Sequence, residues 1–230
     1  MHLCPIHRTH LRSTLEQPTI AKYSTLNQII PLFPLSHGLF PDGKLHLQIF
    51  EVRYLNLIKQ CHQQQLPFGV VQLINDNQEV QVPGKVPALH QVGCLAHIRE
   101  FDQVQPAFFR VVCQGGLRFQ LTDLQPGPYG VWQGAVTYLP QDPELAVPSE
   151  LQILADKLGK VIASLQKQGK LDKLSIFAPY YLDQCGWLAN RYAEAMPVST
   201  EQQQQLLKEP DPLKRLQDIL QLSQLGQDGD

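Results

Sequence analysis

Hydrophobic residues follow two different spacings along this 230-residue chain, and the change falls at residues 140–143, which read Pro-Gln-Asp-Pro. Before this point, short apolar runs alternate with polar residues and are separated by Pro and Gly, which is typical of β-strands. Beyond it, apolar residues recur every three or four positions, as on one face of an α-helix. The two spacings predict an α+β protein in which a sheet comes first and a helical bundle follows.

Strand spacing is clearest where Leu45, Leu47 and Ile49 alternate with polar residues, so that one face of the strand is buried. A Gly-Gly pair at 115–116 separates two apolar runs and predicts a hairpin turn. Several short strands at this spacing suggest a closed or nearly closed antiparallel sheet. The expected strands cover residues 29–33, 45–49, 68–74, 92–98, 107–113, 117–121 and 131–138.

Helical spacing interrupts the strands once, where Tyr54, Leu55, Ile58 and Cys61 form one stripe within residues 50–61. The other helices are expected beyond residue 143. Their starts are marked by Pro148 or Ser149, by capping boxes of Ser199 with Gln202 or Thr200 with Gln203, and by Asp211 followed by Pro212.

The patterns predict three segments: a flexible tail over 1–26, a β-barrel unit over 27–140 and an α-helical unit over 145–225. The tail contains Cys4, His7 and His10 at a spacing that resembles a metal site. A closed zinc site usually takes four ligands from an ordered scaffold, so no metal site is predicted there.

Composition excludes several classes of protein. The chain has 19 Lys and Arg against 21 Asp and Glu, and a net charge of -2 disfavours a dedicated nucleic-acid binder. No apolar run approaches the roughly 18 residues of a membrane span, and the polar N-terminus argues against a secretion signal. The five Cys are scattered and never spaced as Cys-x-x-Cys, which favours reduced thiols in a cytoplasmic protein.

Motifs for nucleotide-driven or metal-assisted catalysis are absent from the sequence. Neither Gly-x-x-x-x-Gly-Lys-Ser/Thr nor Gly-x-Gly-x-x-Gly occurs, and His-Glu-x-x-His and Gly-x-Ser-x-Gly are also missing. The sequence therefore predicts no catalytic residues and no cofactor.

A small hydrolase remains an alternative, because the neighbouring pairs Ser36-His37 and Cys61-His62 supply a nucleophile and a base. Adjacent residues point apart on a strand or a helix, so adjacency alone is weak support.

An RNA-binding module is the other alternative, with Tyr129 and Trp132 as candidates for base stacking. No basic surplus accompanies them, so both aromatic residues are expected in the core or at its rim. The basic residues of the strand region are dispersed at Lys85, Arg99, Arg110 and Arg118.

One stretch is distinctive as a sequence: Ile-Pro-Leu-Phe-Pro-Leu at 30–35, Leu-Phe-Pro at 39–41 and Leu-x-Leu-x-Ile-Phe-Glu-x-Arg-Tyr at 45–54. It resembles the N-terminal, substrate-recognising domain of the Lon protease family. The similarity covers about 28–222, although Cys94 stands where the family often has Thr. It continues through Phe-Gly-Val-Val at 68–71, Val-Gly-Cys-Leu-Ala-His-Ile at 92–98, Gly-Gly-Leu-Arg-Phe at 115–119 and Pro-Leu-x-Arg-Leu at 212–216.

The resemblance implies a PUA-like antiparallel β-barrel followed by a helical bundle, and a role in binding unfolded or damaged polypeptide. In full Lon enzymes the ATPase and the Ser-Lys peptidase lie on later domains, so the resemblance does not imply proteolysis. We expect a stand-alone, non-enzymatic domain whose partner is unfolded or partner polypeptide, without nucleic acid or membrane. The sequence does not indicate its oligomeric state.

A surface that accepts varied clients should be apolar and shallow, and the seam between sheet and helices is the expected place for it. The three Phe among the candidates are also expected to anchor the core, and Glu51 is expected to pair with Arg53 or with backbone groups. The candidate residues for a polypeptide groove are Phe33, Phe40, Phe50, Arg53 and Tyr54.

Overall fold

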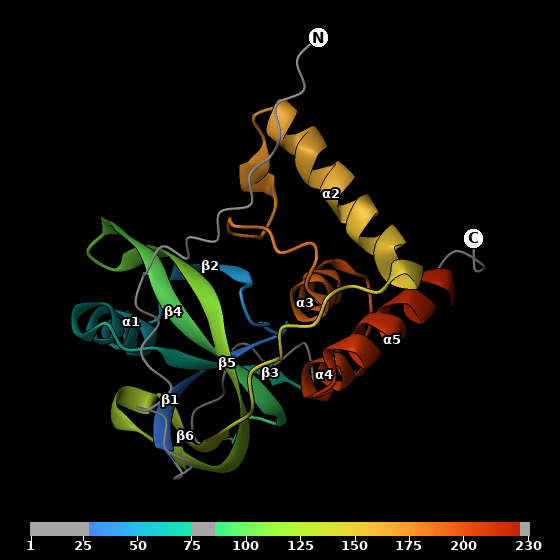
Figure 1. Cartoon of the computed structure of the whole chain (residues 1–230). Coiled ribbons are helices and arrows are strands. Elements are labelled where there is room, and N and C mark those ends of the chain that lie inside the picture. Colours follow the sequence, from blue (N-terminus) through green and yellow to red (C-terminus); the bar gives the residue numbers. More distant parts are fainter. Residues whose placement is uncertain (1–27, 75–85, 226–230) are drawn as a thin grey trace.

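The computed structural model describes residues 28–74 and 86–225. Figure 1 shows a sheet on one side of the molecule and a group of helices on the other, which confirms the predicted α+β order along the chain. The expected tail, with its Cys4, His7 and His10 spacing, lies outside the described residues.

The sheet region extends from residue 28 to residue 138, and the helices follow it. Its elements are β1 (Gln28–Leu35), β2 (Lys44–Ile49), α1 (Val52–Gln64), β3 (Phe68–Leu73), β4 (Leu89–Gln105), β5 (Phe108–Pro126), η3 (Pro128–Gly130) and β6 (Trp132–Tyr138). The helical region contains η4 (Ser149–Leu151), α2 (Gln152–Lys167), η5 (Leu171–Lys173), α3 (Cys185–Ala195), α4 (Thr200–Lys208) and α5 (Pro212–Leu225).

The sheet is mixed: one pair of strands is parallel, which corrects the expected antiparallel sheet at that pair. Its strand order is β2-β5-β4-β3-β1-β6, and β6 also pairs with β5. β1 and β3 run parallel, with Leu32 opposite Gly69, whereas the other neighbouring strands are antiparallel. Parallel strands cannot be joined by a tight turn, and the connection between these two contains β2 and α1.

The predicted hairpin turn at Gly115 and Gly116 is also wrong, because both residues lie inside β5. The turn between β4 and β5 is formed by residues 106–107. Gly115 serves a close approach instead: a Cβ on it would lie 1.9 Å from the backbone oxygen of Phe40. Asp42 N donates to Gly115 O at 2.9 Å, so the loop after β1 is held against the middle of β5.

Two of the predicted helix starts are formed by side-chain caps. The Ser199 hydroxyl accepts a bond from Gln202 N, and the Gln202 side chain accepts one from Ser199 N at 2.9 Å, which completes a capping box. The alternative box on Thr200 with Gln203 is not formed, since Thr200 is already the first residue of α4. Asp211 caps α5 through its carboxylate. The described helices include none that is both long and apolar enough to cross a membrane.

Buried apolar side chains form separate clusters in the two regions. One sheet cluster lies under α1 and includes Phe33, and another lies around Leu95 and Phe119. The helical cluster is built by α2 to α5, and it also takes in Phe40 and Val92 from the sheet region. The helical core is therefore completed by residues that the sheet region supplies.

Phe50 is 69% exposed, so its predicted role as a core anchor is wrong. Ile49 is buried in its place, because successive side chains along β2 point to opposite faces and Phe50 falls on the outer one. Glu51 precedes α1 as its N-cap residue. The alternation along β2 that predicts the strand also predicts this exposure.

Candidate functional site

The seam between the sheet and the helices is filled by buried polar side chains. Asp142 accepts hydrogen bonds from Arg118 Nη2 at 2.9 Å and from Arg215 Nη1 at 2.7 Å. Arg215 also donates to Asn190 Oδ1 at 2.8 Å and to the backbone oxygen of Glu209 at 2.6 Å. Burial and the neighbouring Arg215 lower the pKa of Arg118, whereas Asp142 raises it. These bonds fasten the two regions together, so this part of the seam is not an open groove.

A second polar contact joins α3 to the loop after β1. Phe40 N donates to Glu194 Oε1 at 3.1 Å, and Arg191 Nη2 lies 3.2 Å from Glu194 Oε2. Arg191 also donates to the backbone oxygen of Pro41 at 2.5 Å. Burial raises the pKa of Glu194 to about 7, although Arg191 and the Phe40 N–H act in the opposite direction and Asp42 in the same one. The carboxyl group therefore titrates near neutral pH at the contact between the two regions.

The candidate groove residues do not meet at one surface. Phe33 of β1 and Tyr54 of α1 are buried between the sheet and the helix, where their rings stack with centroids 4.2 Å apart. Phe40 is buried in the helical cluster. These three aromatic residues therefore pack the interior in this structure.

Arg53 and Phe50 lie nearer to solvent, on either side of the start of α1. Arg53 pairs with Glu51 at 2.7 Å, as expected, and its guanidinium group lies 4.5 Å from the centre of the Tyr54 ring. The pair orders the junction between β2 and α1 and leaves Phe50 on the outside.

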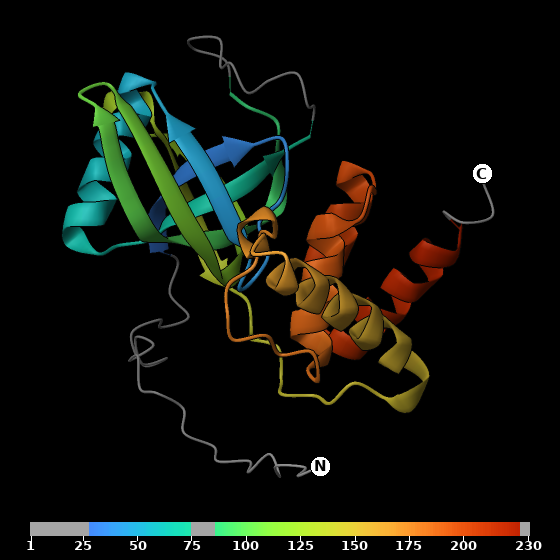
Figure 2. The same cartoon turned by 90° about the horizontal axis from the view of Figure 1, so that it is seen from above.

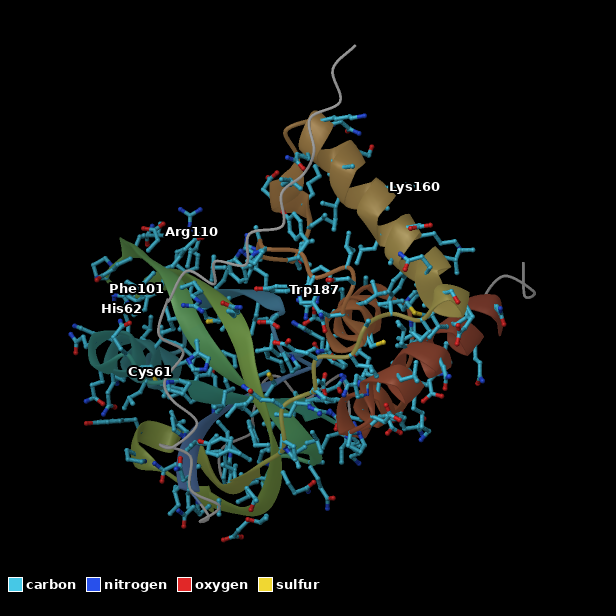
Figure 3. All side chains as sticks on the ribbon, viewed as in Figure 1. Cys61, His62, Phe101, Arg110, Lys160 and Trp187 are labelled. Atoms are coloured by element: carbon cyan, nitrogen blue, oxygen red, sulfur yellow. The ribbon has the colours of Figure 1, made fainter. Side chains whose placement is uncertain are left out.

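The proposed Cys61-His62 pair does not have the geometry of a nucleophile and its base. Cys61 is buried, and burial raises the pKa of its thiol to about 11. His62 stacks on Phe101 with ring centroids 4.5 Å apart, and Figure 3 labels the two residues next to each other. The described cysteines are all free and buried, which agrees with their predicted role as small apolar residues.

The Ser36-His37 pair lies in the bend after β1, where Ser36 is half-buried and His37 is exposed. The backbone oxygen of Ser36 accepts a hydrogen bond from Gln72 Nε2 at 3.3 Å. This bond places the pair beside the seam, where Gln72 also donates to Gln203 Oε1 at 3.0 Å.

The aromatic and basic residues considered for RNA binding are separated in the structure. Trp132 packs against the second sheet cluster, whereas Tyr129 is exposed. Arg118 is buried in the seam, and Arg110 pairs with Asp102 at 3.3 Å on the surface. Lys85 lies outside the described residues.

A shallow groove runs along α2, which Figure 1 shows at the outer side of the helical region. Residues four apart lie on one side of a helix, and here the small residues Ala155, Gly159 and Ala163 form the floor. Leu182 closes it from the segment before α3, and a Cβ on Gly159 would lie 3.2 Å from its Cδ1. We call this surface the α2 groove; it holds about 340 Å³ and is lined by Gln152, Ala155, Asp156, Gly159, Lys160, Ala163 and Leu182.

The α2 groove combines an apolar floor with a polar rim of both charges. Asp156 and Lys160 lie on the rim one helical turn apart, and Figure 3 labels Lys160. A shallow apolar surface with few directional groups accepts varied side chains, because it imposes no single shape or charge. The chemistry that this surface can perform is binding.

Sequence reasoning does not single out the α2 groove, although one signal for it is present. Ala155, Gly159 and Ala163 are spaced by four within a segment whose apolar stripe is predicted. The groove itself depends on Leu182, which reaches α2 only through the tertiary fold.

Three comparisons relate the chain to known proteins. The model of the substrate-binding domain of ATP-dependent protease La (Lon) matches residues 29–224. The crystal structure of a Lon N-terminal domain protein from Xanthomonas campestris is similar with a TM-score of 0.64 and 27% identity, covering 84% of this chain and 97% of that chain. The curated protein sequences gave no match.

A second solved structure, the N-terminal domain of Mycobacterium avium complex Lon protease, has a TM-score of 0.52 and 17% identity, with the same coverage of both chains. At this identity the likeness shows the fold alone. The family model, in contrast, spans nearly all of the described residues, in both the sheet and the helical region. The chain belongs to the family of Lon substrate-binding domains.

Proposed function

We propose that this protein is a non-enzymatic binding domain for polypeptide, and that unfolded segments of its substrates dock in the α2 groove. The groove carries the proposal, because it is shallow, apolar along its floor and open to solvent. It lies on α2, at the outer side of the helical region (Figure 1). Family membership supports a substrate-binding role for the domain.

The dimensions of the α2 groove suit a short stretch of chain. Its lining extends from Gln152 to Ala163, about 17 Å along the helix axis at 1.5 Å per residue. An extended segment of about five residues has the same length. Apolar side chains of such a segment would cover the floor, while Asp156 and Lys160 would bond to its backbone.

A cytoplasmic location and the exclusion of nucleic acid as a partner are part of the same proposal. Free, buried cysteines suit a reducing cytoplasm. The net charge of -2 gives no general attraction for nucleic acid.

The test places a charge on the groove floor by Ala163→Glu. The probe is fluorescein-labelled, reduced and carboxymethylated lysozyme, and fluorescence anisotropy measures its dissociation constant. We expect about tenfold weaker binding, about 1.4 kcal/mol, because the new carboxylate must be desolvated. The matched control is Ser164→Glu, which adds the same charge to the same helix outside the groove lining and should bind as the wild type does.

No association with the wild type would contradict the proposed function. Equal binding by the two Glu variants would remove the α2 groove from it. Cleavage of the probe by the purified protein would contradict its non-enzymatic part.

A further inference from the structure

The outer edge of β2 is the end of the sheet. β2 is the first strand in the strand order and pairs with β5 along one side. Figure 2 shows β4, β5 and β2 side by side in this order. An unpaired edge presents a row of backbone donors and acceptors that a further strand can use.

The backbone bonds at the start of β2 show which peptide groups point outward. Gly43 O accepts from Gly115 N at 2.9 Å on the β5 side, whereas Lys44 N donates to Ser175 O at 3.1 Å on the other side. In an antiparallel pair the peptide groups of successive residues alternate in direction. The N–H and C=O groups of His46 and Gln48 therefore point away from β5, and we call this row the β2 edge.

The chain itself already uses the first position of this edge. Ile176 forms an antiparallel bridge with Gly43, next to the Lys44–Ser175 bond. The Lys44 ammonium group lies 5.2 Å from the centre of the Phe177 ring. On its N-terminal side this short segment leads back to η5, which ends at Lys173, so its pairing stops before His46. Residues 175–177 thus show that an antiparallel strand fits here, and among the described residues no strand pairs with the remainder of this edge.

The far end of the β2 edge is apolar. Phe50 and Val52 are 69% and 73% exposed, directly after the strand. Beyond Lys44 the exposed side chains of β2 are those of His46 and Gln48, so this stretch holds no Lys, Arg, Asp or Glu, and the strand contains no Pro. The usual devices that protect an edge strand, such as added charges, Pro or a bulge, are therefore missing from this stretch.

We propose that the β2 edge binds an extended segment of a client polypeptide by antiparallel strand addition, with backbone bonds to His46 and Gln48 and an apolar side chain against Phe50 and Val52. The client would start near Phe50 and end near Ser175, continuing the direction of residues 175–177. About five residues fill the available length of about 17 Å. Backbone pairing is independent of side chains, which suits clients of varied sequence.

This inference rests on the proposed function, and the chain links the two surfaces. The segment between α2 and α3 supplies Leu182 to the α2 groove and Ser175 to the β2 edge. The α2 groove and the β2 edge therefore lie along the same segment of the protein, so one client chain could contact both.

The test uses Gln48→Pro, which removes the backbone N–H of residue 48 that points away from β5. Proline is tolerated on an edge where the N–H faces solvent, so the bonds to β5 are kept. With the carboxymethylated lysozyme probe we expect at least tenfold weaker binding by Gln48→Pro. The matched control Gln48→Thr changes the side chain, keeps the N–H and should bind as the wild type does. Binding by Gln48→Pro equal to that of the wild type would overturn the inference.

A second measurement leaves the protein unchanged, in case the proline variant fails to fold. The probe is an eight-residue peptide of Thr and Val. Two further peptides have the same sequence but carry N-methyl groups at alternate residues, which block the N–H groups along one edge of the extended peptide in the first and along the opposite edge in the second. We expect one methylated form to lose binding, and hydrogen exchange at the amides of His46 and Gln48 to slow with the unmethylated peptide. Equal binding of all three peptides overturns strand addition.

The outcomes separate this inference from the proposed function. Binding that falls with Ala163→Glu but not with Gln48→Pro leaves the function standing and overturns the β2 edge. Absence of all binding by the wild type overturns both. A self-associated form that pairs through β2 and does not release on adding the probe would assign the edge to a second copy, and would also overturn the inference.

Discussion

The sheet region and the helical region are stabilised in different ways. The strands are joined by continuous backbone pairing and enclose apolar clusters made from their own residues and α1. The helical cluster takes Phe40 and Val92 from the sheet region, and α2 extends along its outer side (Figure 1). The comparison teaches that the two sheet clusters contain only residues of the sheet region, whereas the helical cluster depends on Phe40 and Val92 from the sheet region for part of its core.

The polar contacts show the same dependence. Arg118 of β5 and Arg215 of α5 share Asp142, which lies in the connection between the two regions. Buried ion pairs add little net stability compared with apolar packing, but removing one partner is costly. The seam therefore sets the orientation of the helices more than it adds to the overall stability.

The largest expected effect is that of Asp142→Ala. Two buried guanidinium groups lose their carboxylate, and we expect the free energy of unfolding to fall by about 3–5 kcal/mol. Denaturant unfolding measures this loss in the free energy of unfolding. Hydrogen exchange should show a larger loss of protection in α3 and α5 than in β4.

The control for Asp142→Ala is Asp102→Ala, which removes a surface pair with Arg110. Its side chains are 62% and 61% exposed, so the cost should stay below about 1 kcal/mol. Equal loss of protection in β4 and α5 after Asp142→Ala would break the comparison, because it would show one cooperative unit.

Glu194 should make the stability of the contact between the two regions depend on pH. Its folded pKa of about 7 lies above the ordinary value of 4.5, so between these pH values the folded protein holds a proton that the unfolded chain has released. The free energy of unfolding therefore falls as the pH rises through this window, by about 3 kcal/mol from this group. Glu194→Gln keeps an acceptor for Phe40 N. It should remove the contribution of this group to the fall in the free energy of unfolding.

The measurement for Glu194→Gln is denaturant unfolding of both proteins at pH 5 and pH 8. The stability difference between variant and wild type should favour the variant more at pH 8 than at pH 5. An identical pH dependence in the two proteins would show that Glu194 does not titrate in this window.

The smallest of the three effects is expected for Gly115→Ala, in the sheet region. The added Cβ would meet the backbone oxygen of Phe40, and overpacking of this kind costs about 1–3 kcal/mol. Gly38→Ala is the matched control, because its nearest neighbour would lie at 3.6 Å. Thermal unfolding measures both, and equal melting temperatures would contradict the role assigned to Gly115.

Much of the fold could be predicted from the sequence, because hydrophobic periodicity and helix caps are local signals that indicate strands and helices. The alternation of Leu45, Leu47 and Ile49 gives β2, and Ser199 and Asp211 mark the helix starts that are found. The burial of three of the candidate groove residues could not be predicted. Phe33, Phe40 and Tyr54 are recognisable as part of a distinctive stretch, but a single sequence does not separate a buried aromatic residue from one that lines a surface.

The sequence by itself determined the order of strands and helices and the family, because periodicity, caps and a local motif depend on neighbours along the chain. Only the tertiary structure decided the parallel pairing of β1 with β3, the place of Gly115 inside β5 and the sharing of Asp142 by two arginines. Each of these joins residues far apart in the sequence. Their free energy depends on burial and distance in the folded chain, which no local pattern records.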